Sequence, residues 1–259
     1  MKEAENLKNF WDSMAERFSE YEIPSISDNC FLRNLHMNGI FDTKGCALDI
    51  GCGGGKYSLA IAPYFDKVIG TDISDRMITA AEEKRKAEKI ENAVFTCAVW
   101  DEIDIEKEGW KNKFDFVFAH MTPAVGSKET IEKMRAASKN NCAVTKSVYR
   151  KSMIADKINS ICSYDEQYGK DDVLELFKIL WADGIMPKVF YEKETWNDIS
   201  PTEKAVDRYI KRMSVKRELS AKEKNEIADY MNGISVNGMV TETTDAVVCT
   251  VYWSEKKEN

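Results

Sequence analysis

The most constraining feature of this chain is a glycine-rich turn that follows a short apolar run. Residues 46–55 have the sequence CALDIGCGGG. The apolar run is typical of a buried parallel strand, and residues 56–62 are typical of the start of a helix. Glycines at 51, 53 and 55 let the backbone turn tightly and let a ligand come close, because a Cβ would narrow that space. The start of the following helix offers unpaired N–H groups and a positive dipole end, which suit a carboxylate or a phosphate.

The spacing of the glycines and of two acids distinguishes between the common classes of protein with such a turn. A dinucleotide fingerprint, G-x-G-x-x-G, would place its third glycine at Lys56 when counted from Gly51. The observed pattern is instead D-x-G-x-G-x-G, which begins at Asp49. A second apolar run ends at Asp72, about 20 residues after the first glycine, the spacing at which an acid meets a ribose hydroxyl in βαβ units. The alternative is that the glycine turn and the strand-end acid belong to an α/β protein of some other class.

On these residues the sequence resembles the class I S-adenosylmethionine-dependent methyltransferases, whose first motif is similar. The resemblance covers roughly residues 40–150. It implies S-adenosyl-L-methionine as cofactor and S-adenosyl-L-homocysteine as product, with Asp72 on the ribose and Asp49 either ordering the loop or meeting the amino group. The implied cofactor-binding residues are Asp49, Gly51, Cys52, Gly53, Asp72, Ile73, Met77, Val99, Trp100 and His120.

The segment after the third predicted strand departs from the family pattern. Many relatives carry an Asp there that accepts a hydrogen bond from the adenine amino group, whereas Val99 stands at the most natural matching position. We therefore expect adenine to be held by backbone groups and by contact with Val99 and Trp100, unless Asp101 takes the role. Each of two implied contacts also has a purely structural alternative: Trp100 could anchor the loop, and Met77 could be an ordinary residue of the hydrophobic core.

Two residues are candidates for catalysis on the acceptor side. His120 follows the fourth predicted strand and would face the donor methyl, as a general base, as a hydrogen-bond partner of the substrate, or as a loop histidine that ties down backbone. Tyr21 ends an amphipathic helix that precedes Pro24. In the resembling family a leading helix often lies over the cofactor, and aromatic residues at its end help to enclose the substrate. Thr122 either bonds the substrate or shapes the turn before Pro123.

Strand and helix patterns alternate along residues 45–150, which predicts parallel strands with right-handed crossovers. With the resemblance, we expect an α/β fold: a doubly wound, seven-stranded, mostly parallel sheet in the order 3-2-1-4-5-7-6, with the last strand antiparallel and helices on both faces. We expect one methyltransferase domain over 1–259. Its predicted parts are an N-terminal helical cap at 1–40, a cofactor-binding core at 41–150, the remaining sheet at 151–199 and 239–259, and a helical lid at 200–238.

The lid is predicted to have two helices, with capping boxes beginning at Ser200 and Ser220. It carries a basic cluster that is either a solvated helix face or an anchor for an acidic substrate, with a nucleic-acid contact as a third alternative. This cluster, called the lid basic cluster below, consists of Lys204, Arg208, Lys211, Arg212, Lys216 and Arg217.

Composition limits the partners. A formal net charge of −7 and a pI of about 5.2 provide no global positive field for nucleic acid or anionic lipid. Seven cysteines are scattered without metal-ligand spacing, so no metal is expected. No apolar run approaches the roughly 18 residues of a membrane span, and the first residues lack a signal-peptide core. The cytoplasm is therefore the expected compartment, and no feature indicates an oligomeric state.

Together these features predict S-adenosylmethionine-dependent methyl transfer by in-line displacement, with a small-molecule acceptor favoured by the acidity and the lid. A protein or tRNA acceptor, a non-catalytic S-adenosylmethionine-binding module and a nicotinamide-dependent oxidoreductase are the competing hypotheses.

Overall fold

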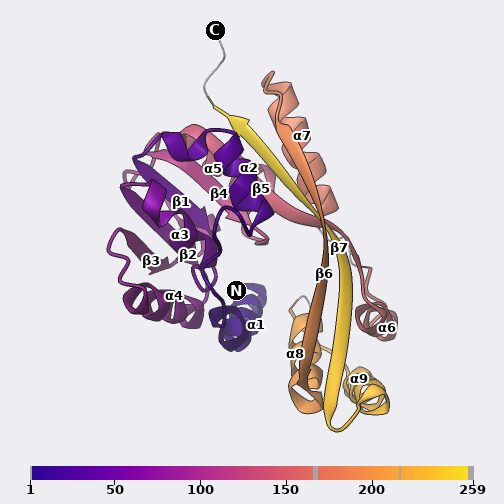
Figure 1. Ribbon diagram of the computed structural model, residues 1–259. Helices are drawn as coiled ribbons and strands as arrows, with labels where there is room; N and C mark the ends of the chain where they lie inside the picture. Colours follow the sequence, from indigo (N-terminus) through magenta and orange to yellow (C-terminus); the bar gives the residue numbers. More distant parts are fainter. Residues whose placement is uncertain (1, 166–168, 216, 256–259) are drawn as a thin grey trace.

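A single seven-stranded sheet organises the chain in the computed structural model, which describes residues 2–165, 169–215 and 217–255 (Figure 1). The strand order is β3-β2-β1-β4-β5-β7-β6, as predicted. The first five strands pair in parallel, and β7 pairs antiparallel with both β5 and β6. The strands are β1 (Cys46–Ile50), β2 (Lys67–Asp72), β3 (Ala93–Cys97), β4 (Phe114–His120), β5 (Ser138–Lys151), β6 (Lys188–Pro201) and β7 (Met239–Ser254).

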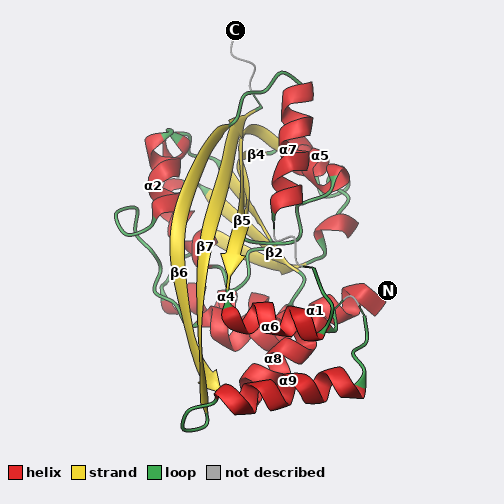
Figure 2. Cartoon of the chain, turned by 90° about the vertical axis from the view of Figure 1, so that its right-hand side faces the viewer, coloured by secondary structure: helices red, strands yellow, loops and turns green. Residues whose placement is uncertain are grey.

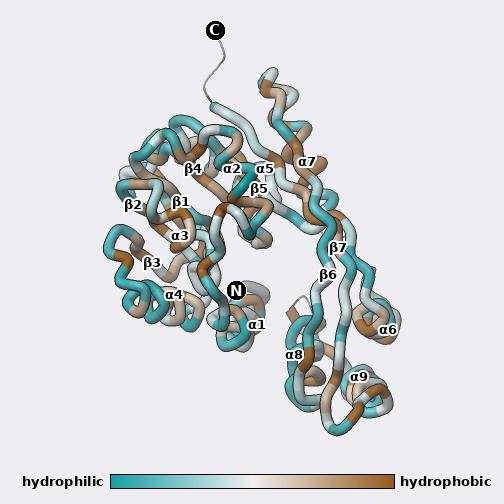
Figure 3. The backbone as a smooth tube through the Cα atoms, in the orientation of Figure 1, coloured by the Kyte–Doolittle hydropathy of each residue, from teal (hydrophilic) through white to brown (hydrophobic). Residues whose placement is uncertain are grey.

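Helices cover both faces of the sheet. Leu32 of α2 (Cys30–Met37), Leu59 of α3 (Lys56–Ile61) and Ala81 of α4 (Asp75–Ala87) lie in one buried cluster. On the other face, Met134 of α5 (Lys128–Ala137) and Leu180 of α7 (Lys170–Ala182) join a second cluster. Three 3₁₀ turns, Ile40–Asp42, Ala62–Tyr64 and Trp100–Glu102, complete the connections. Figure 3 shows β1 and β4 as largely hydrophobic, which is the pattern of strands buried on both sides.

The last strands are longer than their sequence suggests. Apolar runs place strands near 142–149, 188–192 and 246–253, whereas β5, β6 and β7 extend over residues 138–151, 188–201 and 239–254. The extra length leaves the core, where β6 alternates between half-buried and exposed residues instead of continuing an apolar run. β6 and β7 thus form a long antiparallel pair that reaches from the core to the helices between them in sequence (Figures 1 and 2); this pair of strands is called the hairpin below, although residues 202–238 separate its strands.

The two helices within the predicted lid, residues 200–238, share a hydrophobic core with a helix from outside those bounds, residues 153–161. Buried residues from α6 (Met153–Ile161), α8 (Thr202–Met213) and α9 (Ala221–Ile234) pack together around Ile158, Tyr209 and Met231. The Ser220 capping box is present, since Ser220 and Glu223 exchange hydrogen bonds at the start of α9. The capping box expected at Ser200 is wrong, because β6 continues through Ser200 and α8 begins at Thr202 after Pro201.

The N-terminal helix α1 (Lys2–Ser19) lies between the core and the lid, below the carboxyl ends of the parallel strands (Figure 1). It packs against α4 through Met14, Ala15 and Met77, and it contacts α8 on the other side. None of the helices in the described ranges is both long and apolar enough to cross a bilayer.

Candidate cofactor and acceptor site

The glycine turn after β1 adopts the backbone that its sequence predicts. Gly51, Gly53 and Gly55 have φ angles of +70°, +53° and +84°, which non-glycine residues rarely adopt. The N–H groups of Gly51 and Cys52 both donate to the Thr71 carbonyl, at 2.7 and 2.9 Å, and so fix the turn against β2. A Cβ at Gly53 would have no neighbour within 4 Å. The turn is therefore rigid where it meets β2 and open at Gly53, where a ligand would approach.

Asp72 at the end of β2 faces this turn. Its Oδ2 accepts the Gly53 N–H at 2.9 Å, and its Oδ1 accepts the Ser74 N–H at 2.9 Å. Burial raises the pKa of Asp72, while these two backbone donors act in the opposite direction. The carboxylate thus holds the glycine loop and the β2–α4 turn together at the place where the sequence predicts a ribose contact.

Asp49 lies behind the loop and not in it. Its side chain is 1% exposed and accepts the Ser58 Oγ–H at 2.6 Å. Burial raises its pKa to about 7; the Ser58 hydrogen bond opposes the shift, and the negative charge of Asp72 adds to it. The contact joins β1 to α3 across the turn, which favours the loop-ordering role among the two expected for Asp49.

The predicted adenine side is only partly accessible. Ile73 and Val99 are half-buried, but Met77 is 1% exposed beneath α1. Trp100 is 3% exposed, and its Nε1–H donates to the Thr130 carbonyl at 3.2 Å. Trp100 is therefore positioned as a loop anchor in the core, the alternative role expected from the sequence. Asp101 is exposed next to it.

Tyr21 closes the other side of the glycine loop. Its hydroxyl donates to the Gly54 carbonyl at 2.6 Å, and a Cβ at Gly54 would lie 2.6 Å from the Phe18 carbonyl oxygen. Glycine at position 54 thus lets the end of α1 approach the loop backbone. Tyr21 thus contacts the glycine loop, and its expected part in enclosing the substrate stays a prediction.

His120 stands at the carboxyl end of β4 between two aromatic rings. Its imidazole centroid lies 4.0 Å from that of Tyr57 and 4.7 Å from that of Phe31. Burial lowers its pKa to about 3, and the nearby Lys56 charge contributes to the shift. The imidazole is therefore neutral at physiological pH, and within the described part of the chain no side chain forms a hydrogen bond to it.

Tyr57 and Phe31 were not selected from the sequence. Tyr57 follows the last glycine of the turn by two residues, so its position beside the loop could have been predicted from the motif. Phe31 comes from α2, and only the fold brings it to His120. Thr122, in contrast, is buried, and its Oγ1 accepts the Ala124 N–H at 3.2 Å. These contacts agree with its turn-shaping role.

Comparison with known families agrees with this geometry. A family model described as a methyltransferase domain matches residues 42–205, which is more than half of the chain. The chain belongs to this methyltransferase family. Methyltransferases of this class use S-adenosylmethionine as the methyl donor. Both the class and the cofactor are as expected from the glycine motif.

Solved methyltransferases share the fold at low sequence identity. Magnesium protoporphyrin IX methyltransferase from Synechocystis PCC 6803 is 13% identical with a TM-score of 0.51, and the alignment covers 96% of this chain and 99% of that one. Geranyl diphosphate C-methyltransferase from Streptomyces coelicolor A3(2) is 11% identical with a TM-score of 0.51, covering 97% and 98%. These similarities confirm the methyltransferase fold over nearly the whole chain.

Curated relatives match over a shorter region. The tRNA/tmRNA (uracil-C(5))-methyltransferase of Photorhabdus laumondii is 35% identical over 69 residues, 27% of this chain and 19% of that protein. The enzyme of the same name from Escherichia fergusonii is 41% identical over 69 residues, again 27% and 19%. The chain thus spans about a fifth of the length of these relatives.

The lid basic cluster of this methyltransferase is largely neutralised by neighbouring carboxylates. Arg208 contacts both Asp198 and Glu242, and Arg212 lies over the Tyr209 ring, 5.7 Å from its centroid. Lys216 lies outside the described residues. The remaining pairs are Lys204 with Glu16, Lys211 with Asp207, and Arg217 with Glu223. This arrangement favours a structural role for the lid basic cluster over a role as an anchor for an acidic substrate.

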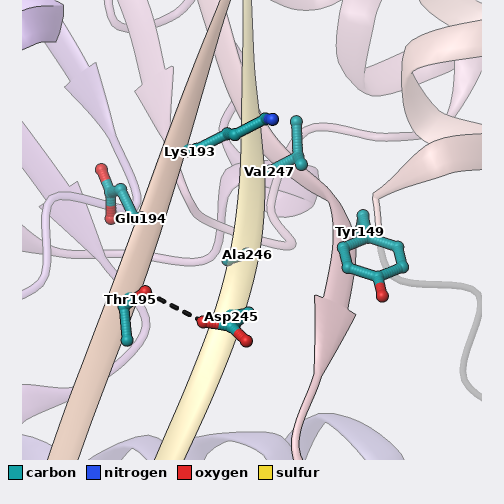
Figure 4. A pocket seen from close by; sticks show the side chains of 7 residues that line it. All are labelled: Tyr149, Lys193, Glu194, Thr195, Asp245, Ala246 and Val247. Carbon is teal, nitrogen blue, oxygen red and sulfur yellow. Dashed lines mark hydrogen bonds between the residues drawn. The ribbon is translucent and has the colours of Figure 1, made fainter.

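The hairpin also has a hollow of about 290 Å³. Figure 4 shows Tyr149, Lys193 and Val247 on one side of β6 and β7, while Glu194 points to the opposite side. Strand alternation places Glu194 with Glu192, and these two carboxylates are among the charges that help burial to raise the pKa of Tyr57 to about 12. The hollow therefore opens on the face of the hairpin away from Tyr57, and it does not belong to the candidate site.

Proposed function

We propose that this chain transfers a methyl group from S-adenosylmethionine to a small-molecule acceptor bound between the carboxyl edge of the sheet and the helical lid. The observation that carries the proposal is the position of Asp72, whose carboxylate joins the Gly53 and Ser74 N–H groups beside the glycine loop. An acid at this place can accept hydrogen bonds from ribose hydroxyls, and the open side of Gly53 leaves room for the ligand to approach.

The residues present fit the cofactor. The backbone of Gly51, Cys52 and Gly53 would hold its methionine part, Asp72 its ribose, and Ile73 and Val99 its base. When bound, the cofactor supplies a methyl group that its sulfonium already activates. The protein therefore has to align the acceptor and exclude water, and a base is needed only if the acceptor must lose a proton early.

His120 is better suited to hydrogen bonding than to proton removal. A general base works best when its pKa lies near the working pH, whereas the pKa of His120 is lowered to about 3. We therefore assign His120 the role of a neutral partner that orients the acceptor beside Tyr57, and Tyr21 the role of closing the loop side of the site.

A small acceptor is supported by charge and by the lid. The net charge is −7, and the described residues of the lid basic cluster are engaged with carboxylates or with an aromatic ring, which disfavours a phosphate backbone as a ligand. The similarity to tRNA methyltransferases is confined to about a fifth of those proteins. We therefore do not propose a tRNA acceptor, and we include tRNA as an alternative acceptor in the methyl-transfer test below.

The first test is calorimetry with S-adenosylhomocysteine. We expect Asp72→Ala to lose at least about tenfold in affinity, since hydrogen bonds to a charged group contribute about 1.5–3 kcal/mol each. Asp101→Ala is the matched control, because Asp101 is an exposed acid and the sequence left it open as an adenine contact. Equal affinity of wild type and Asp72→Ala, or a larger loss in Asp101→Ala, would refute the assignment.

The second test is methyl transfer itself. Labelled S-adenosylmethionine would be incubated separately with a small-metabolite extract, with total tRNA and with protein. Label entering only the small-molecule fraction is expected. Label in tRNA or protein would replace the proposed acceptor class, and tight cofactor binding without any transfer would leave a binding module.

A further inference from the structure

Helix α1 is bound to the turn that carries the candidate cofactor site. Asp12 Oδ1 accepts the Ser74 Oγ–H at 2.5 Å. Lys8 Nζ lies 2.9 Å from Asp12 Oδ2 and 2.7 Å from Asp75 Oδ2, so it bridges α1 and the first residue of α4. Met77, two residues further along α4, packs against α1 in an apolar contact. Polar and apolar contacts thus fix α1 to the β2–α4 turn.

A short chain of hydrogen bonds connects Asp12 to the glycine loop. Ser74 binds Asp12 through its hydroxyl and Asp72 through its N–H, and Asp72 binds the Gly53 N–H with its other oxygen. Ser74 Oγ also accepts the Met77 N–H and so caps α4. A change in the position of Asp12 therefore acts on the groups that would contact the ribose.

The same helix also contacts the lid and the hairpin, but through weaker interactions. Its Arg17 lies 3.4 Å from Asp198 of β6, and its Glu16 lies 3.1 Å from Lys204 of α8. Asn6 Nδ2 donates to the carbonyls of residues 214 and 215, at 3.3 and 3.4 Å. The Glu16–Lys204 pair is exposed and the Arg17–Asp198 pair is partly exposed, and surface ion pairs contribute at most about 1 kcal/mol each.

Space separates the two sets of contacts. A hollow of about 420 Å³ lies where α1, α4 and α8 meet, and it is lined by Asn9, Asp12, Ser13, Arg76 and Lys211. The helix is thus held firmly on the cofactor side and loosely on the lid side. Its contacts with the lid can therefore open while its contacts with the β2–α4 turn persist.

We propose that α1 couples the cofactor site to the lid, with Asp12 as the positioning residue on the cofactor side. A ligand that orders the Asp72–Ser74 turn then also orders α1 and, through residues 6, 16 and 17, the lid. Because coupling free energies are reciprocal, seating the lid on an acceptor tightens cofactor binding to the same extent. The inference rests on the proposed function, since it takes S-adenosylmethionine as the first ligand.

The donor side is tested by calorimetry with S-adenosylhomocysteine on Asp12→Ala, Asp12→Asn and Glu5→Gln. We expect a loss of about tenfold for Asp12→Ala, as removal of an acceptor from a charged hydrogen bond predicts. Asp12→Asn should recover most of that loss, since its amide oxygen still accepts the Ser74 hydroxyl proton. Glu5→Gln removes an exposed charge from the same helix and should bind like wild type. Unchanged affinity in Asp12→Ala would overturn the positioning role.

The coupling is tested by hydrogen exchange with and without S-adenosylhomocysteine. In wild type we expect the ligand to slow exchange at the glycine loop, in α1 and in α8. In Asn6→Ala/Glu16→Gln/Arg17→Met, which removes all three described lid-side contacts, the slowing at the loop and in α1 should remain, while that in α8 should disappear. Binding without any slowing in α8 of the wild type would overturn the coupling and leave the proposed function intact. Failure of the wild type to bind the nucleoside at all would overturn both.

Discussion

The buried carboxyl of Asp49 makes the stability of this fold depend on pH in a direction opposite to that of most acids. Its pKa is about 7 in the folded chain, compared with 3.8 when exposed. Between those values the folded state holds a proton that the unfolded state has lost, so stability falls as pH rises from about 4 to about 7. With about 1.4 kcal/mol for each unit of pKa, ionised Asp49 costs the folded state about 4 kcal/mol above pH 7.

The perturbation that tests this cost is Asp49→Asn. Asparagine cannot ionise, and its side-chain oxygen can still accept the Ser58 hydroxyl proton. Relative to wild type, we expect the variant to be more stable by about 1 kcal/mol at pH 4.5 and by about 4 kcal/mol at pH 8, so that the difference between the two proteins grows by about 3 kcal/mol over this range. Urea unfolding of the ligand-free protein at several pH values measures this difference. Ser58→Ala is the opposing control and should lose about 1–2 kcal/mol at pH 8, where it removes a donor to the buried carboxylate.

Two results would refute the reasoning. A stability difference between Asp49→Asn and wild type that does not grow with pH would mean that Asp49 titrates in the folded chain much as it does in the unfolded one. An Asp49→Asn variant less stable than wild type at pH 8 would mean that the charged form is the one the fold favours. Calorimetry on the same variant separates the two expected roles of Asp49, since loop ordering preserves the affinity for S-adenosylhomocysteine and a direct contact to the amino group does not.

Three further substitutions test other parts of the site. Gly51→Ala should destabilise the fold by about 2–4 kcal/mol in urea unfolding, from its positive φ and from a Cβ that would lie 2.1 Å from Thr122 Oγ1 and 2.6 Å from Thr122 Cβ; no relief on adding Thr122→Gly, which removes both atoms, would contradict the clash. Trp100→Leu should lose about 3 kcal/mol of stability, from its buried volume and its bond to Thr130, with affinity for S-adenosylhomocysteine within about twofold of wild type; a large loss of affinity would restore its adenine role. Tyr21→Phe should weaken that affinity about fivefold by removing about 1 kcal/mol of hydrogen bonding to the loop, and an unchanged dissociation constant would show that Tyr21 does not help to close the site.

The donor half of the molecule could be predicted because its determinants are local. Strand, turn, helix N-terminus and strand-end acid follow one another within residues 46–72, and each has a physical reason to adopt its conformation wherever the rest of the chain lies. Gly51 and Asp72 accordingly have the geometry that the sequence predicts. Trp100 was left open because a large aromatic after a strand suits both a ligand contact and a core anchor, and only the position of the Thr130 carbonyl distinguishes them.

The length of the hairpin could not be read from hydrophobicity. Outside the core, β6 is stabilised by pairing with β7 and by contacts with α8, so its residues alternate and include Glu, Lys and Asp. The same cause explains the error at Ser200, since a capping-box sequence does not form a cap while its backbone is paired in a strand. On α7, the apolar residues Leu174 and Trp181 are 56% and 58% exposed, because the helix packs through Val173, Leu176 and Leu180.

The acceptor half depends on residues that are distant in sequence. Phe31 of α2, Tyr57 of α3 and His120 of β4 meet only because the sheet order places those elements together. Each is an ordinary aromatic residue in its own segment, so no local pattern identifies the group. The basic residues of α8, which were conspicuous in the sequence, are engaged within the fold. If His120 orients the acceptor as we propose, substitutions around His120 should change which acceptor is methylated, while substitutions in the glycine loop should change the affinity for S-adenosylmethionine.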